Sequence, residues 1–438
     1  MVTLMSSPLL SAAEHLSQSF SSLEGLNTSD TLLINEQSRS LEASGAQVFK
    51  LGFGQSPFPV YEPAVRQLAE RASSKAYLPV QGLPELRAQV AQFHQKLDQV
   101  EWAQERVIIG PGSKLLLFAL LSALPPETEV IIPSPAWVSY APQARLAARQ
   151  VHRLSAHFEG RWYPSAEALD HWCRQTGPRP RLYIHNAPNN PTGLSLSHTE
   201  QAELASVARK HGVMILADEI YGPLHHKGAH RPFALDYPEG TITSSGLSKW
   251  CGAGGWRLGV MHVPHALGER LFQGLIGFAS ETWSSVTSPI QEAACVAYTW
   301  SDELEEYLNH QRAWLAEIGL RYSDTLRSAE VRVHPPEGGF YLLPDFERHR
   351  ERLATKGIYS SADLTARLLS EAGVALLPGS AFGCPADQLC ARLAYVDFDG
   401  ADLPLRPPEG DQDPLLTLRQ LRRLGEGREA LMSWLARL

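Results

Sequence analysis

Cysteine is scarce in this chain, and the way it is spaced excludes several classes of protein. Five cysteines are scattered over 438 residues without any Cys-x-x-Cys pair, so we expect neither a zinc site nor a disulfide framework. The sixteen histidines contain no His-Glu-x-x-His pattern, and the adjacent pair His225 and His226 would point apart in any regular element. We expect reduced thiols, no metal centre and a cytoplasmic location.

Long apolar runs and an excess of basic residues are missing as well. The best membrane candidate, residues 115–126, is shorter than the roughly 18 apolar residues that a spanning helix needs. No basic residue precedes the apolar start of the chain, so a secretory signal is not expected. A formal net charge of −8 gives no electrostatic reason to bind nucleic acid or an anionic membrane.

What the chain does contain is the composition of a folded protein, with 44% hydrophobic and 20% charged residues. Between about residues 105 and 265, short β-branched runs alternate with longer helical patterns. This alternation predicts a three-layer α/β/α domain with a mostly parallel sheet. The strands are expected at 106–109, 130–132, 181–184, 213–216, 241–243 and 258–261, and two of the helices at 114–124 and 199–211.

The length of the chain predicts about two domains. We expect a large domain over residues 61–309 and a smaller α+β domain over 310–438, with short strands near Arg332, Phe340 and Arg392. Residues 1–60 are expected to form an N-terminal arm and part of the small domain. The acidic, proline-rich stretch 397–414 predicts a solvated loop before one last amphipathic helix, 415–438.

The most informative stretch is Gly246-Leu-Ser-Lys-Trp-Cys-Gly-Ala-Gly-Gly-Trp-Arg-Leu-Gly259. Lys249 follows a predicted strand, and Arg257 comes eight positions later, beyond a cluster of glycines. A lysine held away from solvent can lose its proton and attack a carbonyl, and an arginine offers a planar fork to a phosphate. An isolated lysine is usually a surface residue, so the interpretation of Lys249 as a reactive amine depends on the residues around it.

The stretch resembles the cofactor-lysine motif of class I/II pyridoxal 5′-phosphate (PLP) aminotransferases, the aspartate aminotransferase-like enzymes of fold type I. The resemblance extends from about Gly52 to Tyr395, with its landmarks in the family's order. It implies an enzyme that moves an amino group from an L-amino acid to a 2-oxo acid, with PLP held as a Schiff base on Lys249.

The resemblance also implies contacts to the PLP ring. Asn190, in Asn189-Asn-Pro-Thr-Gly193, and Tyr221, in Asp218-Glu-Ile-Tyr221, would bond the phenolic oxygen. Asp218 would keep the ring nitrogen protonated, so that the ring can accept the electrons of a broken Cα–H bond. Lys249, Asp218 and Tyr221 are therefore the expected catalytic residues.

Contacts to the phosphate are implied next. Gly112, Ser113 and Lys114 lie between a predicted strand and helix, and a helix N-terminus is a ready phosphate site. Ser248 and Arg257 would complete that site.

Two aromatic residues complete the cofactor set that the resemblance implies. Trp137 would stack on the ring, and Tyr77 would reach the phosphate of the neighbouring subunit. If Tyr77 does so, the enzyme is a homodimer with shared active sites.

Substrate recognition is assigned to Arg392, which would hold the α-carboxylate, together with Asn190 and Gly54. Gly54 corresponds to the glycine of a covering loop, although Gln55-Ser56-Pro57-Phe58 departs from the acidic residue and Pro-Asp that usually follow. Two residues point to different side chains for the amino acid that donates the amino group. Lys114 aligns with a lysine that reaches the distal carboxylate of acidic substrates in one subgroup. Trp283 falls where the partner subunit often lines the substrate pocket and would favour an apolar or aromatic donor.

Two alternatives to transamination use the same residues. A PLP-dependent lyase or synthase (elimination or ring closure, as in aminocyclopropane-carboxylate synthases) shares all of these contacts. A non-catalytic PLP-binding regulator fused to a DNA-binding module is disfavoured, because no basic patch precedes Gly54.

Overall fold

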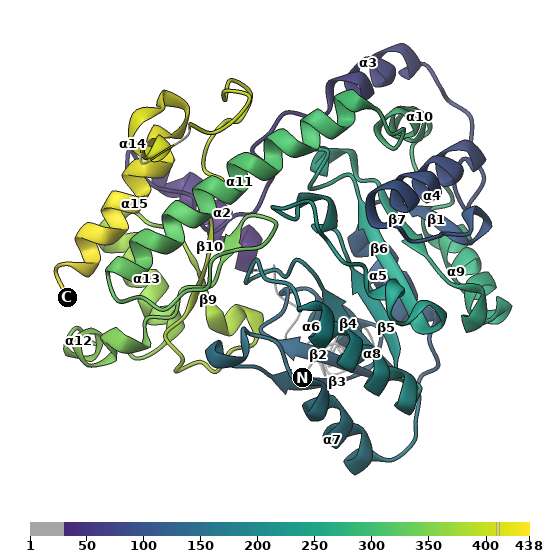
Figure 1. Ribbon diagram of the computed structural model, residues 1–438, viewed down its shortest axis with the longest axis horizontal. Coiled ribbons are helices and arrows are strands. Elements are labelled where there is room, and N and C mark those ends of the chain that lie inside the picture. Colours follow the sequence, from purple (N-terminus) through teal and green to yellow (C-terminus); the bar gives the residue numbers. More distant parts are fainter. Residues whose placement is uncertain (1–29, 409, 411) are drawn as a thin grey trace, which may run out of the picture.

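The computed structural model describes residues 30–408, 410 and 412–438, and its two sheets divide the chain into a larger and a smaller part (Figure 1). Residues 1–29 of the predicted N-terminal arm therefore lie outside the described residues. Within the described part of the chain, no helix combines the length and the apolarity that crossing a bilayer requires.

The larger part contains the predicted α/β sheet. Its strands are β1 (Val107–Gly110), β2 (Glu129–Ser134), β3 (Gln150–Ser155), β4 (Arg181–Asn186), β5 (Met214–Asp218), β6 (Thr241–Gly246) and β7 (Gly259–His262), in the order β1-β7-β6-β5-β4-β2-β3. β7 is antiparallel to both of its neighbours, and the other pairs are parallel. All six predicted strands are present. The edge strand β3 was not predicted, because it carries polar residues such as Gln150 and Arg153.

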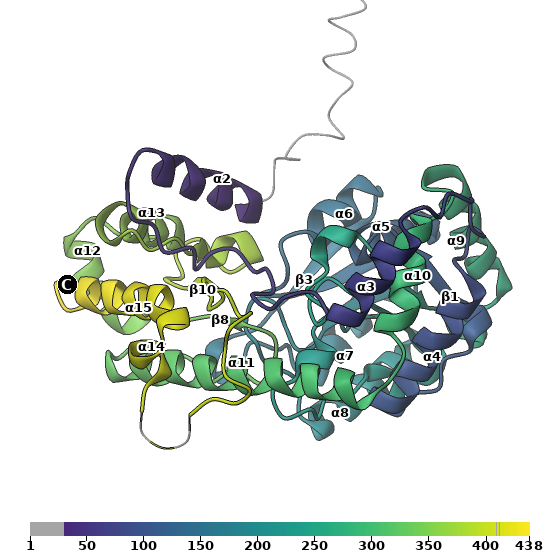
Figure 2. The ribbon, with the colours of Figure 1, turned by 90° about the horizontal axis from the view of Figure 1, so that it is seen from above.

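Helices cover both faces of this sheet, as Figure 2 shows from above. They are α3 (Glu62–Arg71), α4 (Pro84–Asp98), α5 (Ser113–Ala123), α6 (Tyr140–Leu146), α7 (Ala166–Thr176), α8 (His198–His211), α9 (Glu269–Thr282) and α10 (Ser288–Ala297). Alternate strand residues face the two layers: Val130 and Ile132 pack with α5 and α9, while Ile131 packs with α7 and α8. The predicted three-layer fold is confirmed.

The smaller part is built on an antiparallel sheet of three short strands, β8 (Tyr341–Leu342), β9 (Leu377–Pro378) and β10 (Ala391–Ala394), in the order β8-β10-β9. Its helices are α2 (Asp30–Ala43), α12 (Arg350–Thr355), α13 (Ser361–Ala372), α14 (Pro414–Thr417) and α15 (Arg422–Leu435). Near Arg332 the structure has an isolated bridge to Asp345 in place of a strand. The single helix predicted over 415–438 is wrong: Leu418 is extended, and the break lets α14 pack back on α15.

One long helix, α11 (Asp302–Ser328, 27 residues), joins the two parts (Figure 1). It contacts the 3₁₀ turn η4 (Gly222–Leu224) in the larger part and β8 in the smaller one. The predicted solvated loop lies against α11, where Trp314 Nε1 donates a hydrogen bond of 2.7 Å to the Pro404 carbonyl and Leu403 is buried. The expectation of a solvated loop is therefore wrong for these residues.

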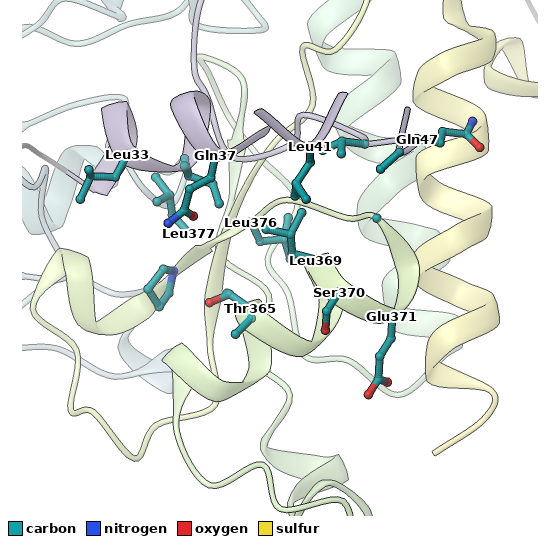
Figure 3. A pocket seen from close by; sticks show the side chains of 16 residues that line it. Leu33, Gln37, Leu41, Gln47, Thr365, Leu369, Ser370, Glu371, Leu376 and Leu377 are labelled. Atoms are coloured by element: carbon teal, nitrogen blue, oxygen red, sulfur yellow. The ribbon is translucent and has the colours of Figure 1, made fainter. Parts of the chain in front are cut away.

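A cavity of about 550 Å³ lies between α2 and α13. Its lining is mostly apolar and includes Leu33, Leu41, Leu369 and Leu376 (Figure 3). It shares no lining residue with the pocket at the carboxyl ends of the strands.

Candidate active site

The candidate active site is a pocket of about 500 Å³ at the carboxyl ends of the parallel strands. Asp218 ends β5, and Ser248 and Lys249 follow β6. On the other side the pocket is closed by Gly54 and by Arg392 from the small sheet. The predicted residues that line it are Gly54, Ser113, Lys114, Trp137, Asn190, Asp218, Tyr221, Ser248, Lys249, Arg257 and Arg392.

The lysine amine lies where the two parts of the chain meet. Lys249 Nζ donates a hydrogen bond of 2.9 Å to the Gly54 carbonyl and lies 5.6 Å from the ring centroids of Tyr221 and Phe340. The buried neighbours Leu247 and Trp250 hold the turn that carries it. The amine is thus presented to the pocket and held by a single backbone oxygen.

Asp218 is a buried carboxylate, and only one of its two oxygens accepts a side-chain hydrogen bond. Tyr140 Oη donates to its Oδ2 at 2.6 Å, while Oδ1 is buried without a hydrogen-bond partner. The Asn186 side-chain amide donates to the Asp218 carbonyl at 2.7 Å and holds the strand end in place. Burial raises the pKa of Asp218 to about 6, although the Tyr140 hydrogen bond acts in the opposite direction. A cationic N–H group in the pocket would satisfy Oδ1.

An anion site lies at the opposite end of the pocket floor. Gly112 has a left-handed φ of 87°, and a Cβ there would overlap the Arg257 guanidinium. Ser113 begins α5 and presents free backbone N–H groups beside that guanidinium. Ser248 lines the same end, so the predicted phosphate residues come together although Gly112 itself lies just behind the pocket surface.

Arg392 is a fully buried cation. Its Nη atoms donate to Asn190 Oδ1 at 3.0 Å and to the Gly52 carbonyl at 2.6 Å, and its Nε has no partner. Burial lowers the pKa of this guanidinium, and among the described residues no carboxylate forms an ion pair with it. An anion in the pocket would supply the missing partner.

Lys114 is a second cation that no carboxylate in the described part of the chain pairs with, at the exposed side of the pocket. Its Nζ lies 5.2 Å from the ring centroid of Trp137. The pKa of Lys114 is lowered, first by loss of hydration and then by the positive charges of Arg257 and Lys249.

Several further pocket residues were not predicted from the sequence, among them Tyr140, Asn186 and Tyr341. Asn186 could have been identified from the sequence, because it is a polar residue at the end of a buried strand. Two predicted residues stand apart. Tyr77 is 94% exposed and does not line the pocket, and Trp283 packs near Phe278 instead of lining it.

The residues present fit PLP. A helix N-terminus with Arg257 and Ser248 suits its phosphate, the unpartnered Asp218 Oδ1 suits a protonated ring nitrogen, and the Lys249 amine suits its aldehyde. A pocket with these residues, at the carboxyl edge of a mostly parallel seven-stranded sheet, has the arrangement expected of a PLP-dependent enzyme of fold type I.

Comparison with known proteins narrows this class. A family described as "Aminotransferase class I and II" matches residues 46–399. An aspartate aminotransferase of Geobacillus stearothermophilus is 32% identical over 85% of this chain and 92% of its own, and an asparagine–oxo-acid transaminase of Streptococcus mutans is 30% identical over 85% and 93%. The structure of an aspartate aminotransferase from Thermus thermophilus with maleate superposes with a TM-score of 0.79 at 26% identity, over 93% of this chain and 97% of that one. The chain belongs to the class I and II aminotransferase family, and it is an aminotransferase. Membership of this family implies PLP as the cofactor.

Proposed function

We propose that this aminotransferase uses PLP on Lys249 and takes its amino group from an acidic L-amino acid of the aspartate type. The observation that carries the proposal is the number of cations at the pocket. Four line it: Lys249, Arg257, Arg392 and Lys114. The cofactor needs Lys249 and Arg257, which leaves two cations without carboxylate partners, enough for the two carboxylates of one substrate.

The two remaining cations suit different carboxylates. Arg392 is buried, flat and rich in N–H donors, as recognition of an α-carboxylate requires. Lys114 carries a point charge at the pocket mouth, and an anion there would relieve the repulsion from Arg257 and Lys249 that lowers its pKa. An apolar donor side chain would leave that repulsion in place.

The relatives support the same substrate class. Two of them are named for aspartate and asparagine, and the Thermus thermophilus structure holds maleate, which is a dicarboxylate. The aromatic alternative rests on Trp283 of the partner subunit, and the donor titration below distinguishes it from the acidic donor. The relatives are named transaminases, which favours transamination over elimination or ring closure.

The roles of the residues follow from their positions. When bound, PLP supplies a carbonyl that takes up the amino group and a ring that accepts the electrons of the broken Cα–H bond. The Lys249 amine would move the proton, since a positioned amine can act as base and then as acid. Asp218 would pair with the ring nitrogen through Oδ1, Asn190 and Tyr221 would donate to the phenolic oxygen, and Trp137 would cover one ring face.

We also propose a cytoplasmic homodimer. Tyr77 is 94% exposed, an unusual state for a large aromatic side chain, and a partner subunit would cover it. In that arrangement Tyr77 would complete the phosphate site of the partner. The five cysteines are buried and unpaired, as in a reducing compartment.

The test is an absorbance titration of the PLP-loaded protein with aspartate, asparagine, glutamate, phenylalanine and leucine. We expect aspartate to bleach the visible band and a 2-oxo acid to restore it. Lys114→Gln should raise the KM for aspartate about 10–100-fold and leave that of any apolar donor unchanged.

Other outcomes would contradict the proposal in distinct ways. Bleaching by phenylalanine but not by aspartate would refute the acidic donor. A persistent band with release of ammonia would indicate a lyase. Tight binding of a DNA probe without any turnover would indicate a regulator.

A further inference from the structure

We propose that Tyr341 is a positioning residue that holds both Arg392 and Tyr221 in the orientation that the reaction needs. The inference rests on the proposed function, because it concerns how the carboxylate fork and the phenolic-oxygen donor are aimed. Tyr341 is 2% exposed, lies on β8 and lines the pocket.

The ring of Tyr341 supports one face of Arg392. The Arg392 guanidinium carbon lies 4.6 Å from the Tyr341 ring centroid and 4.9 Å from that of Phe382. The two rings therefore constrain the tilt of the guanidinium plane, while Asn190 Oδ1 and the Gly52 carbonyl restrain it within that plane. A planar fork binds a carboxylate with both arms only when its plane is set, so the ring contributes to substrate affinity.

The hydroxyl of Tyr341 acts on Tyr221. The two hydroxyl oxygens are 2.8 Å apart and form a buried hydrogen bond. Each hydroxyl has one proton to donate and two lone pairs to accept with. If Tyr221 donates its proton to the phenolic oxygen of PLP, the bond between the tyrosines must be donated by Tyr341. Tyr341 therefore keeps the Tyr221 proton directed at the cofactor.

The fold leaves room for this arrangement at Gly54. A Cβ at Gly54 would overlap the Tyr341 hydroxyl, so the absence of a side chain there lets the hydroxyl reach Tyr221. The carbonyl of the same glycine accepts the Lys249 bond. On the other side, Tyr341 pairs with Ala394 on β10, the strand that carries Arg392.

The two roles can be separated with two variants of the PLP-loaded enzyme. Tyr341→Phe keeps the ring and removes the hydroxyl, and Tyr341→Leu removes both. The matched control is Tyr322→Phe, which removes a buried hydroxyl bonded to the Leu424 carbonyl, outside the pocket. The first readout is the pH midpoint of the visible absorbance. The second is the Kd of succinate, a dicarboxylate that cannot react, by calorimetry.

We expect Tyr341→Phe to move the pH midpoint by about 0.5–1 unit, since Tyr221 loses its donor, and to bind succinate within about twofold of wild type. Tyr341→Leu should also weaken succinate binding about tenfold. Should the leucine variant not fold, Phe382→Leu removes the second ring contact of Arg392 and should weaken succinate binding without moving the midpoint. Tyr322→Phe should change neither readout.

Unchanged pH behaviour of Tyr341→Phe would overturn the role of the hydroxyl. Succinate affinity that is unchanged in Tyr341→Leu would overturn the role of the Tyr341 ring, and unchanged affinity in Phe382→Leu would show that ring contacts do not set the Arg392 fork. A wild-type protein without a visible band or without succinate binding would contradict the proposed function itself, which is a different result from an unresponsive Tyr341 variant.

Discussion

The two ends of the pocket are built in different ways. At the cofactor end, Asp218, Ser248 and the start of α5 all come from one continuous sheet and its connections. At the carboxylate end, Arg392 and Tyr341 come from a separate three-stranded sheet, and Gly54 from the segment before α3. The cofactor end therefore takes most of its residues from the larger part, with Tyr341 contacting it only through Tyr221, whereas the carboxylate end depends on how the two parts of the chain meet.

The largest effect is expected at the residue that belongs to both ends. Lys249→Ala should abolish turnover and the visible band, because it removes the amine that would carry PLP and move the proton. Lys210→Ala is the control, since Lys210 is an exposed lysine paired with Asp170. Transamination by Lys249→Ala at a rate near wild type would refute the assignment.

The next largest effect should separate the two ends. Arg392→Lys keeps the charge and loses the fork, so kcat/KM for aspartate should fall about 100–1,000-fold while the visible band persists. Arg257→Lys should instead raise the Kd of PLP. If both variants lose PLP to the same extent, the division into two ends is wrong.

The cofactor end should also make its own contribution to the pH dependence of stability. The pKa of Asp218 in the cofactor-free fold is raised from 3.8 to about 6, so ionising this carboxyl costs folding free energy. The contribution of Asp218 to the free energy of unfolding is therefore largest below pH 4 and falls by about 3 kcal/mol as pH rises from about 4 to 6. Urea denaturation of cofactor-free Asp218→Asn should lack this loss, and a wild-type slope in that variant would contradict the prediction.

The smallest expected effect concerns Tyr140, which donates to Asp218 Oδ2 at 2.6 Å. Tyr140→Phe should weaken PLP binding about tenfold, because the ionised carboxylate loses a donor and its pKa rises further. Equilibrium binding of PLP between pH 5.5 and 8 measures this, and the loss should grow toward acidic pH. Succinate affinity of the loaded variant should stay unchanged, since Tyr140 does not touch the carboxylate end.

Most of the cofactor end could be predicted from the sequence, because its residues lie in short contiguous motifs after apolar strands. Tyr140 was missed since its bond to Asp218 joins residues 78 positions apart. Tyr341 was missed for a similar reason, because its partners Tyr221 and Arg392 lie on other elements. The edge strand β3 lacked an apolar pattern, and nothing in the amphipathic period of 415–438 marked the extended Leu418.

The exposure of Tyr77 has a consequence for mixtures of damaged chains. In the proposed dimer, a chain without a functional Tyr77 inactivates the site of the partner subunit. Its own site stays intact, because that site receives Tyr77 from the partner. In a dimer of this chain with one that lacks Lys249, one of the two sites combines Lys249 from the first chain with Tyr77 from the second. Two inactive proteins would then complement each other when mixed, which neither could do as a monomer.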